Sequence, residues 1–184
     1  WIIDPLDGTT NFTRHFPHFC VSIALAHKGE VIIGVVYQPL RNELFNAQKG
    51  QGALLNGKRI STDDDQVVAK SVILINRGAS REEKLLHGEI VKIMSDKART
   101  IRIFGATALD LCNVACGKFD ALIQNGCMFY DCAAGNLIAS EAGALVTDFA
   151  GNPWKLGESK RSDILVSPPR LHAELLGTLN EAGK

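Results

Sequence analysis

The sequence predicts an α/β fold in two successive parts, an antiparallel α+β part over residues 1–66 and an α/β part over residues 67–184. Two observations lead to this prediction. Apolar, β-rich runs separated by turn residues fill the first part, as in an antiparallel meander. Strand-like and helix-like segments alternate in the second part, as in a mixed or parallel sheet covered by helices. We expect the two parts to form one compact unit.

The strands predicted in the first part cover residues 1–3, 21–26, 31–37 and 43–47. The first is apolar throughout, so we expect it to be buried and to end at Pro5. The second and third are separated by His27-Lys28-Gly29-Glu30, which predicts a hairpin. Glycine-rich turns follow the fourth strand, and the polar, acidic stretch 61–66 predicts a surface connection to the second part.

In the second part, the predicted strands cover residues 72–75, 100–104, 119–123 and 144–149, and the predicted helices cover residues 81–95, 106–117, 131–142 and 168–182. Gly117 and Gly143 are placed to end the second and third helices as C-caps. Gly126 predicts a turn before the helix that begins at Asp131. The last helix is amphipathic and is expected to cover one face of the sheet.

Composition excludes several classes of function. Lys plus Arg and Asp plus Glu both number 20, so no basic excess favours nucleic acid or an anionic membrane as a partner. No apolar run is long enough to span a bilayer. Five scattered cysteines fit free thiols in a reducing cytoplasm better than a disulfide framework. Because the chain opens at Trp1, inside a predicted core strand, we expect it to be N-terminally incomplete.

The segment Asp4-Pro5-Leu6-Asp7-Gly8-Thr9-Thr10-Asn11-Phe12 is the most informative one. Two carboxylates three residues apart suit a hard divalent ion such as Mg²⁺. Gly8-Thr9-Thr10 then precedes a predicted helix start, where backbone N–H groups can hold a phosphate. From the spacing alone, an ordinary turn with Asp7 or Thr9 as a helix cap explains the same residues equally well.

A second carboxylate segment is Asp131-Cys132-Ala133-Ala134-Gly135. Asp131 is predicted at the start of a helix, where the helix dipole stabilises a negative charge by about 0.3–1 kcal/mol. The small residues that follow allow another element or a ligand to approach closely. Taken alone, the segment is an ordinary helix N-terminus.

Together, residues 1–12 and 130–135 closely resemble the two signatures of the inositol monophosphatase family. Residues 16–24, 50–57 and 105–111 are also similar to it, particularly to its bacterial SuhB-type members. The resemblance extends from Trp1 to about Pro168. It implies a layered αβαβα sandwich, of the inositol monophosphatase and fructose-1,6-bisphosphatase type, with the active site between the two parts. It also implies Mg²⁺-dependent, Li⁺-sensitive hydrolysis of small phosphate monoesters, and a cytoplasmic homodimer.

The resemblance also assigns roles to residues. It implies metal binding by Asp4, Asp7, Asp131 and the Leu6 carbonyl, phosphate binding by Gly8 and Thr9, catalytic roles for Asp4, Asp7 and Thr9, and substrate contacts from Thr107, Gln124 and Asp131. The Thr9 hydroxyl would help to position the attacking water. His15 and His18 lie near the motif and are expected to be a loop histidine and a packing histidine.

The sequence departs from the family pattern in three places. The family takes a metal-binding Glu, and an Asp that pairs with the signature Thr, from upstream of its first signature, so we expect this chain alone to have weak or no activity. Tyr130 stands where the family usually has Trp, with a small expected effect on packing. Gln124 stands where inositol-cleaving members usually have a Glu that binds sugar hydroxyls.

The change at Gln124 leaves the substrate open. Inositol 1-phosphate is the first choice, and another polyol or sugar phosphate is the second. Histidinol phosphate, a nucleotide-derived phosphate and fructose bisphosphate are further alternatives with the same chemistry. A protein-binding role in transcription, as in some SuhB-like proteins, is an alternative of a different class, although the neutral charge gives no support for direct RNA contact.

Overall fold

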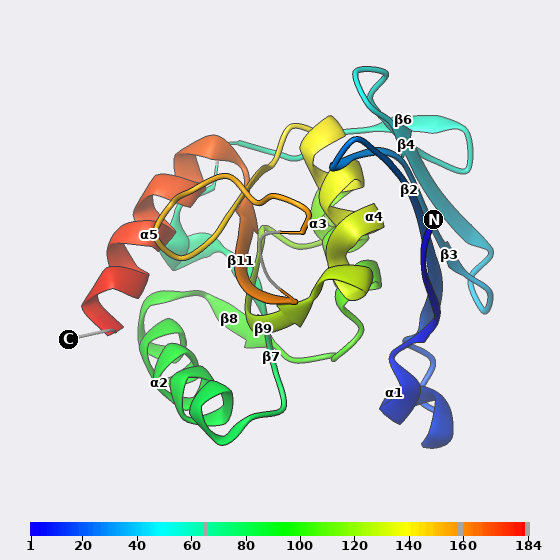
Figure 1. The fold of residues 1–184 in the computed structure, drawn as a ribbon. Helices are drawn as coiled ribbons and strands as arrows, with labels where there is room; N and C mark the ends of the chain where they lie inside the picture. Colours follow the sequence, from blue (N-terminus) through cyan, green and yellow to red (C-terminus); the bar gives the residue numbers. More distant parts are fainter. Residues whose placement is uncertain (65, 158–159, 183–184) are drawn as a thin grey trace.

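The computed structural model describes residues 1–64, 66–157 and 160–182. Figure 1 shows four layers, in the order sheet, helices, sheet, helices. A six-stranded sheet and a five-stranded sheet enclose two helices, α3 (Thr107–Ala115) and α4 (Phe129–Glu141). Two more helices, α2 (Arg81–Lys97) and α5 (Pro169–Ala182), cover the other face of the five-stranded sheet. The predicted mixed α/β architecture is therefore confirmed.

The six-stranded sheet is an antiparallel meander in which the strands lie in chain order. Its strands are β1 (Ile2–Asp7), β2 (Cys20–His27), β3 (Glu30–Gln38), β4 (Glu43–Gln48), β5 (Ala53–Leu55) and β6 (Lys58–Ile60). Lys28 and Gly29 form a two-residue turn with φ values of 50° and 81°, which matches the twist of the β2–β3 hairpin. The strands β5 and β6 were not predicted, because each has only three residues.

Strand β1 differs from the prediction in length and in burial. It continues through Pro5 to Asp7, and Ile3 is 55% exposed. The strand can include Pro5 because it lies at the edge of the sheet and pairs with β2 alone. Proline has no N–H group to donate, and an edge strand has no second neighbour that would need this hydrogen bond. The register with β2 shifts between Asp4 and Asp7, and this irregularity accommodates the proline.

The five-stranded sheet has the order β10-β11-β9-β7-β8. Its strands are β7 (Val72–Arg77), β8 (Thr100–Arg102), β9 (Ala121–Met128), β10 (Leu145–Thr147) and β11 (Arg161–Ser167). The pairs β7–β8 and β7–β9 are parallel, and the other two pairs are antiparallel. Strand β11 was not predicted, although it is central and Ile164, Leu165 and Val166 are fully buried. Gly126 lies inside β9, at a break in its register with β11, and not in a turn.

The helices begin and end close to the predicted positions. Besides the four helices of the layers, α1 (Thr9–Thr13) follows β1, and a short 3-10 helix, η1 (Val68–Lys70), precedes β7. Ser80 and Glu83 form a capping box at the start of α2, with reciprocal side-chain to backbone hydrogen bonds. Helix α4 begins at Phe129, two residues before the predicted start, so Asp131 lies in its first turn.

The middle layer is thin because its contacts are made by small residues. A Cβ atom placed on Gly34 of β3 would lie 2.7 Å from the carbonyl oxygen of Ala134, and one placed on Gly135 would lie 2.7 Å from Cβ of Leu111. Glycine at these positions therefore lets α4 pack directly against the six-stranded sheet and against α3. All residues of α3 are buried, and all five cysteines of the chain are free thiols.

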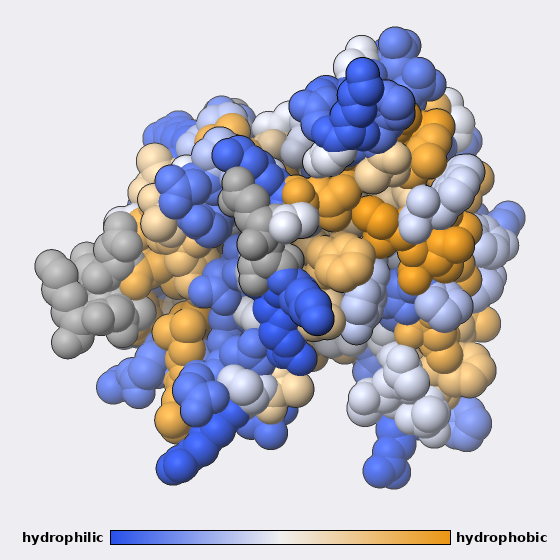
Figure 2. Space-filling model, viewed as in Figure 1, coloured by the Kyte–Doolittle hydropathy of each residue, from blue (hydrophilic) through white to orange (hydrophobic). Residues whose placement is uncertain are grey.

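The outer face of the six-stranded sheet carries apolar side chains that α3 and α4 do not cover. Ile3, Ile23 and Val35 lie side by side across three strands on this face, and all three retain solvent exposure. Figure 2 shows apolar residues along these strands at the right of the view. In Figure 1, none of the described helices lies on this face, so four of the five predicted layers are present. Among the described residues, none of the helices has the length and apolar character that a membrane crossing requires.

Candidate active site

A cavity of about 490 Å³ opens where the end of β1 meets the middle helices and the five-stranded sheet. Polar and apolar residues from both sheets line it. They include Asp7, Thr10, Asn11, Asn76, Arg77, Phe104, Gly105, Thr107, Gln124, Gly126, Met128, Asp131 and Arg161. Four residues that were predicted to belong to the site, each on a different element, therefore line one cavity: Asp7, Thr107, Gln124 and Asp131.

Three carboxylates lie close together beside this cavity, and two of them, Asp7 and Asp131, line it. Strand β1 carries Asp4 and Asp7, and the first turn of α4 carries Asp131. Burial, the charge of Asp4 and a hydrogen bond with Asp4 raise the pKa of Asp131 to about 7. Burial, and then the charge of Asp131, raise the pKa of Asp7 well above its usual value. Nearby negative charge thus adds to burial in disfavouring the ionised forms of Asp7 and Asp131, which protons or a bound cation would relieve.

The carboxylates are already held by protein groups. The backbone N–H of Ala108, in α3, donates to Oδ2 of Asp7 over 2.7 Å. The backbone N–H of Leu6 donates to Oδ1 of Asp4 over 3.0 Å, and the Thr9 hydroxyl donates to the Leu6 carbonyl over 2.9 Å. Within the described residues, no three Asp, Glu, His or Cys side chains are arranged as a ready metal cage. The metal-binding roles of Asp4, Leu6, Asp7 and Asp131 therefore stay predictions.

Gly8 fixes the path of the chain between β1 and α1. Its φ of 84° is in the left-handed region, and a Cβ atom there would lie 2.8 Å from the carbonyl oxygen of His18. The same carbonyl accepts a hydrogen bond of 2.8 Å from Nδ2 of Asn11, which also donates to the carbonyl of Phe104. The start of α1, with the amides of Gly8 and Thr9, is thereby fixed beside the cavity.

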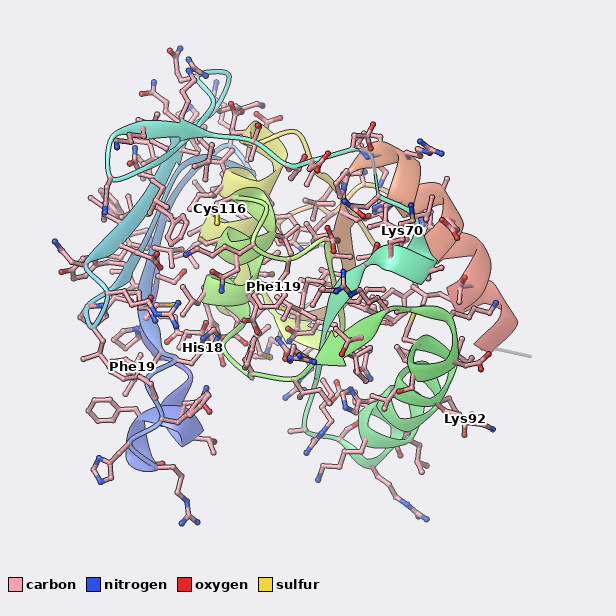
Figure 3. The ribbon with its side chains drawn as sticks, turned by 180° about the vertical axis from the view of Figure 1, so that it is seen from behind. His18, Phe19, Lys70, Lys92, Cys116 and Phe119 are labelled. Atoms are coloured by element: carbon pink, nitrogen blue, oxygen red, sulfur yellow. The ribbon has the colours of Figure 1, made fainter. Side chains whose placement is uncertain are left out.

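A buried hydrogen-bond network supports this arrangement from behind. Nε2 of His18 lies 2.8 Å from Oδ1 of Asp110, and Nδ2 of Asn76 donates to Oδ2 of Asp110 over 2.7 Å. Asp110 is fully buried, and the His18 ring packs on Phe104 with the ring centroids 4.8 Å apart. Figure 3 shows His18 directed towards the interior, while Phe19 is directed away. His18 is thus a packing residue, whereas His15 is exposed at the end of α1.

Thr107, at the start of α3, and Gln124, in β9, also line the cavity. The Thr107 hydroxyl donates to Oε1 of Gln124 over 2.7 Å, and both residues are almost fully buried. Two arginines that sequence analysis missed, Arg77 and Arg161, also line the cavity. Nη1 of Arg161 pairs with Glu83 at 3.0 Å. Arg161 begins the unpredicted strand β11, so no sequence signal connected it with the carboxylates.

Comparison with known proteins identifies the relatives of this chain. The model of the inositol monophosphatase family matches residues 1–184. The chain is 42% identical over 182 residues to the Nus factor SuhB of Haemophilus influenzae, covering 97% of this chain and 66% of that protein. It is 40% identical over 184 residues to the inositol monophosphatase of Dictyostelium discoideum, covering 98% of this chain and 66% of that protein. The chain therefore spans about two thirds of the length of these relatives.

The structure has the same arrangement as solved relatives. The inositol monophosphatase of Anabaena (Nostoc) sp. PCC 7120 superimposes with a TM-score of 0.91 at 34% sequence identity. The match covers 98% of this chain and 71% of that chain.

Proposed function

The chain belongs to the inositol monophosphatase family, and from that premise we propose that its protein hydrolyses a small phosphate monoester with the help of Mg²⁺. The observation that carries the proposal is the convergence of Asp4, Asp7 and Asp131 beside a cavity of about 490 Å³. Myo-inositol 1-phosphate is the proposed substrate, in line with the name of the Dictyostelium relative.

The residues fit a hard divalent cation. Asp4, Asp7 and Asp131, with the Leu6 carbonyl, form a set of oxygen donors of the kind that Mg²⁺ prefers. The raised pKa values of Asp7 and Asp131 indicate that negative charge at these two side chains is uncompensated within the protein. When bound, Mg²⁺ supplies positive charge that neutralises phosphoryl oxygens and activates water.

The chain's own groups would bind and orient the ester. The backbone amides of Gly8 and Thr9 are proposed to hold the phosphate, and the fixed position of Gly8 supports this role. The hydroxyl of Thr9, which donates to the Leu6 carbonyl, is proposed to accept a hydrogen bond from the attacking water. Arg77 and Arg161 add positive charge to the cavity wall, which favours an anionic substrate.

The polyol part of the substrate is proposed to lie against Thr107 and Gln124. Because Oε1 of Gln124 already accepts from Thr107, the amide is oriented with its donor group available to substrate oxygens. The Gln124 amide can donate a hydrogen bond to a substrate hydroxyl, but this bond is weaker than the charge-assisted bond that a hydroxyl donates to a carboxylate. Other sugar or polyol phosphates and histidinol phosphate therefore remain alternative substrates.

Phosphate release from inositol 1-phosphate, with and without Mg²⁺, tests the proposal. The chain is compared with Asp4→Asn, and both are also assayed as fusions to the upstream segment of the Dictyostelium relative. Turnover that needs Mg²⁺ and is lost in Asp4→Asn supports the proposal. Turnover by the chain alone would refute the expectation that upstream carboxylates are indispensable. Absence of turnover by the fusion on inositol and other polyol phosphates would overturn the proposed activity.

A second candidate is a protein-binding role, which the name of the Haemophilus relative, Nus factor SuhB, favours. The two candidates predict different results for one variant. Asp4→Asn should remove turnover but leave binding to a protein partner intact, because Asp4 is hydrogen-bonded to Asp131 at the proposed metal site.

A further inference from the structure

Asp110 is a buried carboxylate that the proposed hydrolysis does not use. It lies in the first turn of α3, it is fully buried, and it does not line the carboxylate cavity. Burying a carboxylate is costly unless hydrogen bonds replace its lost hydration. Exchanging a buried, paired charge for apolar groups of similar volume is often neutral or stabilising. The stability of the fold alone therefore gives no reason for an aspartate at this position.

The two oxygens of Asp110 hold two different segments of the chain. Nε2 of His18, in the loop between α1 and β2, lies 2.8 Å from Oδ1. Nδ2 of Asn76, near the end of β7, donates to Oδ2 over 2.7 Å. Both partners are buried. One side chain of α3 thus ties the loop after α1 to the five-stranded sheet.

Each partner of Asp110 in turn holds a segment that lines the cavity. Oδ1 of Asn76 accepts a hydrogen bond of 3.2 Å from the N–H of Gly105, in the turn before α3. The carbonyl of His18 accepts a hydrogen bond of 2.8 Å from Nδ2 of Asn11, in α1. Asn11, Asn76 and Gly105 all line the carboxylate cavity. The turn before α3 and the helix α1 are therefore connected through Asp110.

The proposed phosphate site lies between these two segments. A Cβ atom on Gly8 would lie 2.8 Å from the carbonyl oxygen of His18 and 3.1 Å from Cβ of Ala106. The turn at Gly8 thus touches both the loop that His18 belongs to and the turn before α3. A shift of either segment would move the amides of Gly8 and Thr9 relative to Thr107. A misplacement of about 1 Å can lower the rate of an enzyme about 100-fold.

We propose that Asp110 is a positioning residue of the active site, which sets the spacing between the phosphate-binding turn and the start of α3. The inference rests on the proposed phosphatase function, because the phosphate-binding amides of Gly8 and Thr9 are part of that proposal. Asp110 acts through His18 and Asn76 and not on the substrate itself. Its loss releases both segments, so that the phosphate end and the polyol end of the ester are no longer held at one spacing.

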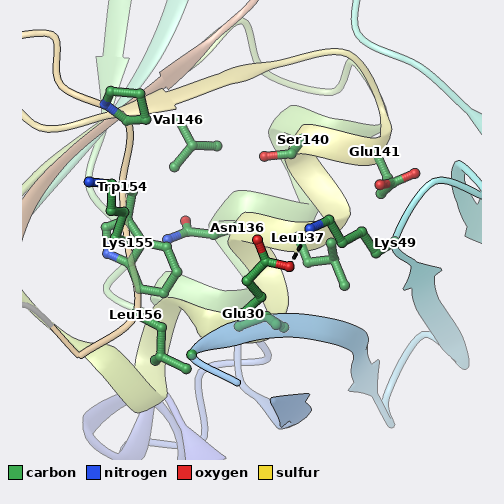
Figure 4. A pocket seen from close by; sticks show the side chains of 13 residues that line it. Glu30, Lys49, Asn136, Leu137, Ser140, Glu141, Val146, Trp154, Lys155 and Leu156 are labelled. Atoms are coloured by element: carbon green, nitrogen blue, oxygen red, sulfur yellow. Dashed lines mark hydrogen bonds and ion pairs between the residues drawn. The ribbon is translucent and has the colours of Figure 1, made fainter. Parts of the chain in front are cut away.

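Glu141, the last residue of α4, provides a matched control. Its carboxylate also holds a separate segment, since it accepts hydrogen bonds of 2.7 Å from the N–H groups of Gly50 and Gly52. Figure 4 shows Glu141 on α4 among the side chains that line a second cavity, of about 520 Å³. Neither Glu141 nor the two glycines line the carboxylate cavity. Glu141→Leu therefore removes a comparable pair of hydrogen bonds away from the proposed site.

Hydrogen exchange, measured for single amides by NMR, tests the positioning without requiring turnover. In Asp110→Leu, the backbone N–H of Gly105 and the side-chain amide of Asn11 should exchange at least about tenfold faster, because two hydrogen bonds of the network are lost. The N–H of Gly52 should keep its exchange rate. In Glu141→Leu the pattern should be reversed, with faster exchange at Gly52 alone.

Asp110→Asn is the conservative variant, and it carries the test if Asp110→Leu does not fold. Its amide has one acceptor oxygen where the carboxylate has two. At least one of the two probes, the Gly105 N–H or the Asn11 amide, should therefore exchange about threefold faster, since about one hydrogen bond is lost. The effect should be smaller than in Asp110→Leu.

Steady-state kinetics of the active form connect the network with the substrate. In Asp110→Leu, KM for inositol 1-phosphate and the inhibition constant of inorganic phosphate should both rise about tenfold, with a smaller rise in Asp110→Asn. The Mg²⁺ concentration for half-maximal activity should not rise, because the hydrogen bonds of Asp110 go to His18 and Asn76. A purely structural role would lower kcat through the fraction of folded protein and leave both constants unchanged.

Three results would overturn the inference. They are unchanged exchange at Gly105 and Asn11 in a folded Asp110 variant, equal acceleration at Gly52, which indicates general destabilisation, and a lower kcat with both constants unchanged. Failure of the proposed function has a different signature, since no form would then hydrolyse a phosphate ester. The exchange rates would still decide whether Asp110 holds the two segments in place.

Discussion

Thr107 of α3 and Gln124 of β9 are joined inside the carboxylate cavity by a hydrogen bond of 2.7 Å, in which the threonine hydroxyl donates to Oε1 of the glutamine. The bond determines which end of the Gln124 amide faces Thr107. The family resemblance implied a role towards substrate for both residues, but not this dependence of one on the other.

Replacing Thr107 by Val should release the Gln124 amide while keeping the shape of the buried side chain. We expect KM for inositol 1-phosphate to rise about fivefold, since the loss of one neutral hydrogen bond is worth about 1 kcal/mol. The Mg²⁺ concentration for half-maximal activity should not change. Steady-state kinetics of the active form check this, and an unchanged KM would show that Gln124 does not need Thr107 for its orientation.

The pKa of Asp131 predicts that protons and Mg²⁺ compete. Burial and Asp4 raise this pKa to about 7, so the side chain is mostly protonated at pH 6 and mostly ionised at pH 8. The apparent affinity for Mg²⁺ should therefore be roughly tenfold higher at pH 8 than at pH 6. The Mg²⁺-induced rise in melting temperature measures this affinity.

The stability of the metal-free chain should change in the opposite direction. A carboxyl group with a raised pKa in the folded state stabilises the fold at low pH, and this contribution is lost as the pH rises towards 7. Asp131→Asn should make both the Mg²⁺ affinity and the stability of the metal-free chain less dependent on pH. A Mg²⁺ effect that is independent of pH in the unaltered chain would contradict the assignment of Asp131 as a ligand.

His172 predicts a separate loss of stability in acid. It is 2% exposed, between the hydroxyls of Ser167 and Thr147, and burial lowers its pKa to about 4. The unfolded chain binds a proton near pH 6.5 and the folded chain does not, so stability falls as the pH drops from 6.5 to 4, by up to roughly 3 kcal/mol. Urea unfolding at several pH values should show this fall, and His172→Gln should reduce it. Parallel curves for the two proteins would refute the prediction.

Gly135 is expected to tolerate no side chain. A Cβ atom there would lie 2.7 Å from Cβ of Leu111, so Gly135→Ala should destabilise the chain by about 1–3 kcal/mol. The control is Gly88→Ala in α2, where a Cβ atom meets nothing within 4 Å and should stabilise the helix by about 0.5–1 kcal/mol. Denaturant unfolding compares the two variants. Equal effects would mean that α3 and α4 can move apart at little cost.

Much of the fold follows from local pattern. The hairpin of β2 and β3, the strand β4 and the helices α2 to α5 are long enough for periodicity and end signals to define them. Strand β11 was missed because its apolar run is short and follows a polar loop, and only pairing with β9 and β10 makes it central. The exposure of β1 was mispredicted because an apolar run does not show whether another layer covers it.

The candidate site was predictable only in part. The Asp4-to-Phe12 segment and the Asp131 segment carry family signatures, so the roles of their residues could be inferred from the sequence. Where the two segments lie relative to each other is known only from the structure. The positions of Arg161 and Asn76 depend on strand order in the five-stranded sheet, which no local pattern encodes. The burial of Asp110 against His18 is likewise a contact between residues 92 positions apart.

Helix α4 carries Asp131 in its first turn, and Gly34 and Gly135 let the same helix pack directly against the six-stranded sheet and against α3. The position of Asp131 relative to Asp4 and Asp7 on β1 is therefore set in part by two glycines that lie outside the carboxylate group. A side chain at either glycine would displace the helix and the carboxylate with it, so the packing of the middle layer and the geometry of the three carboxylates would change together.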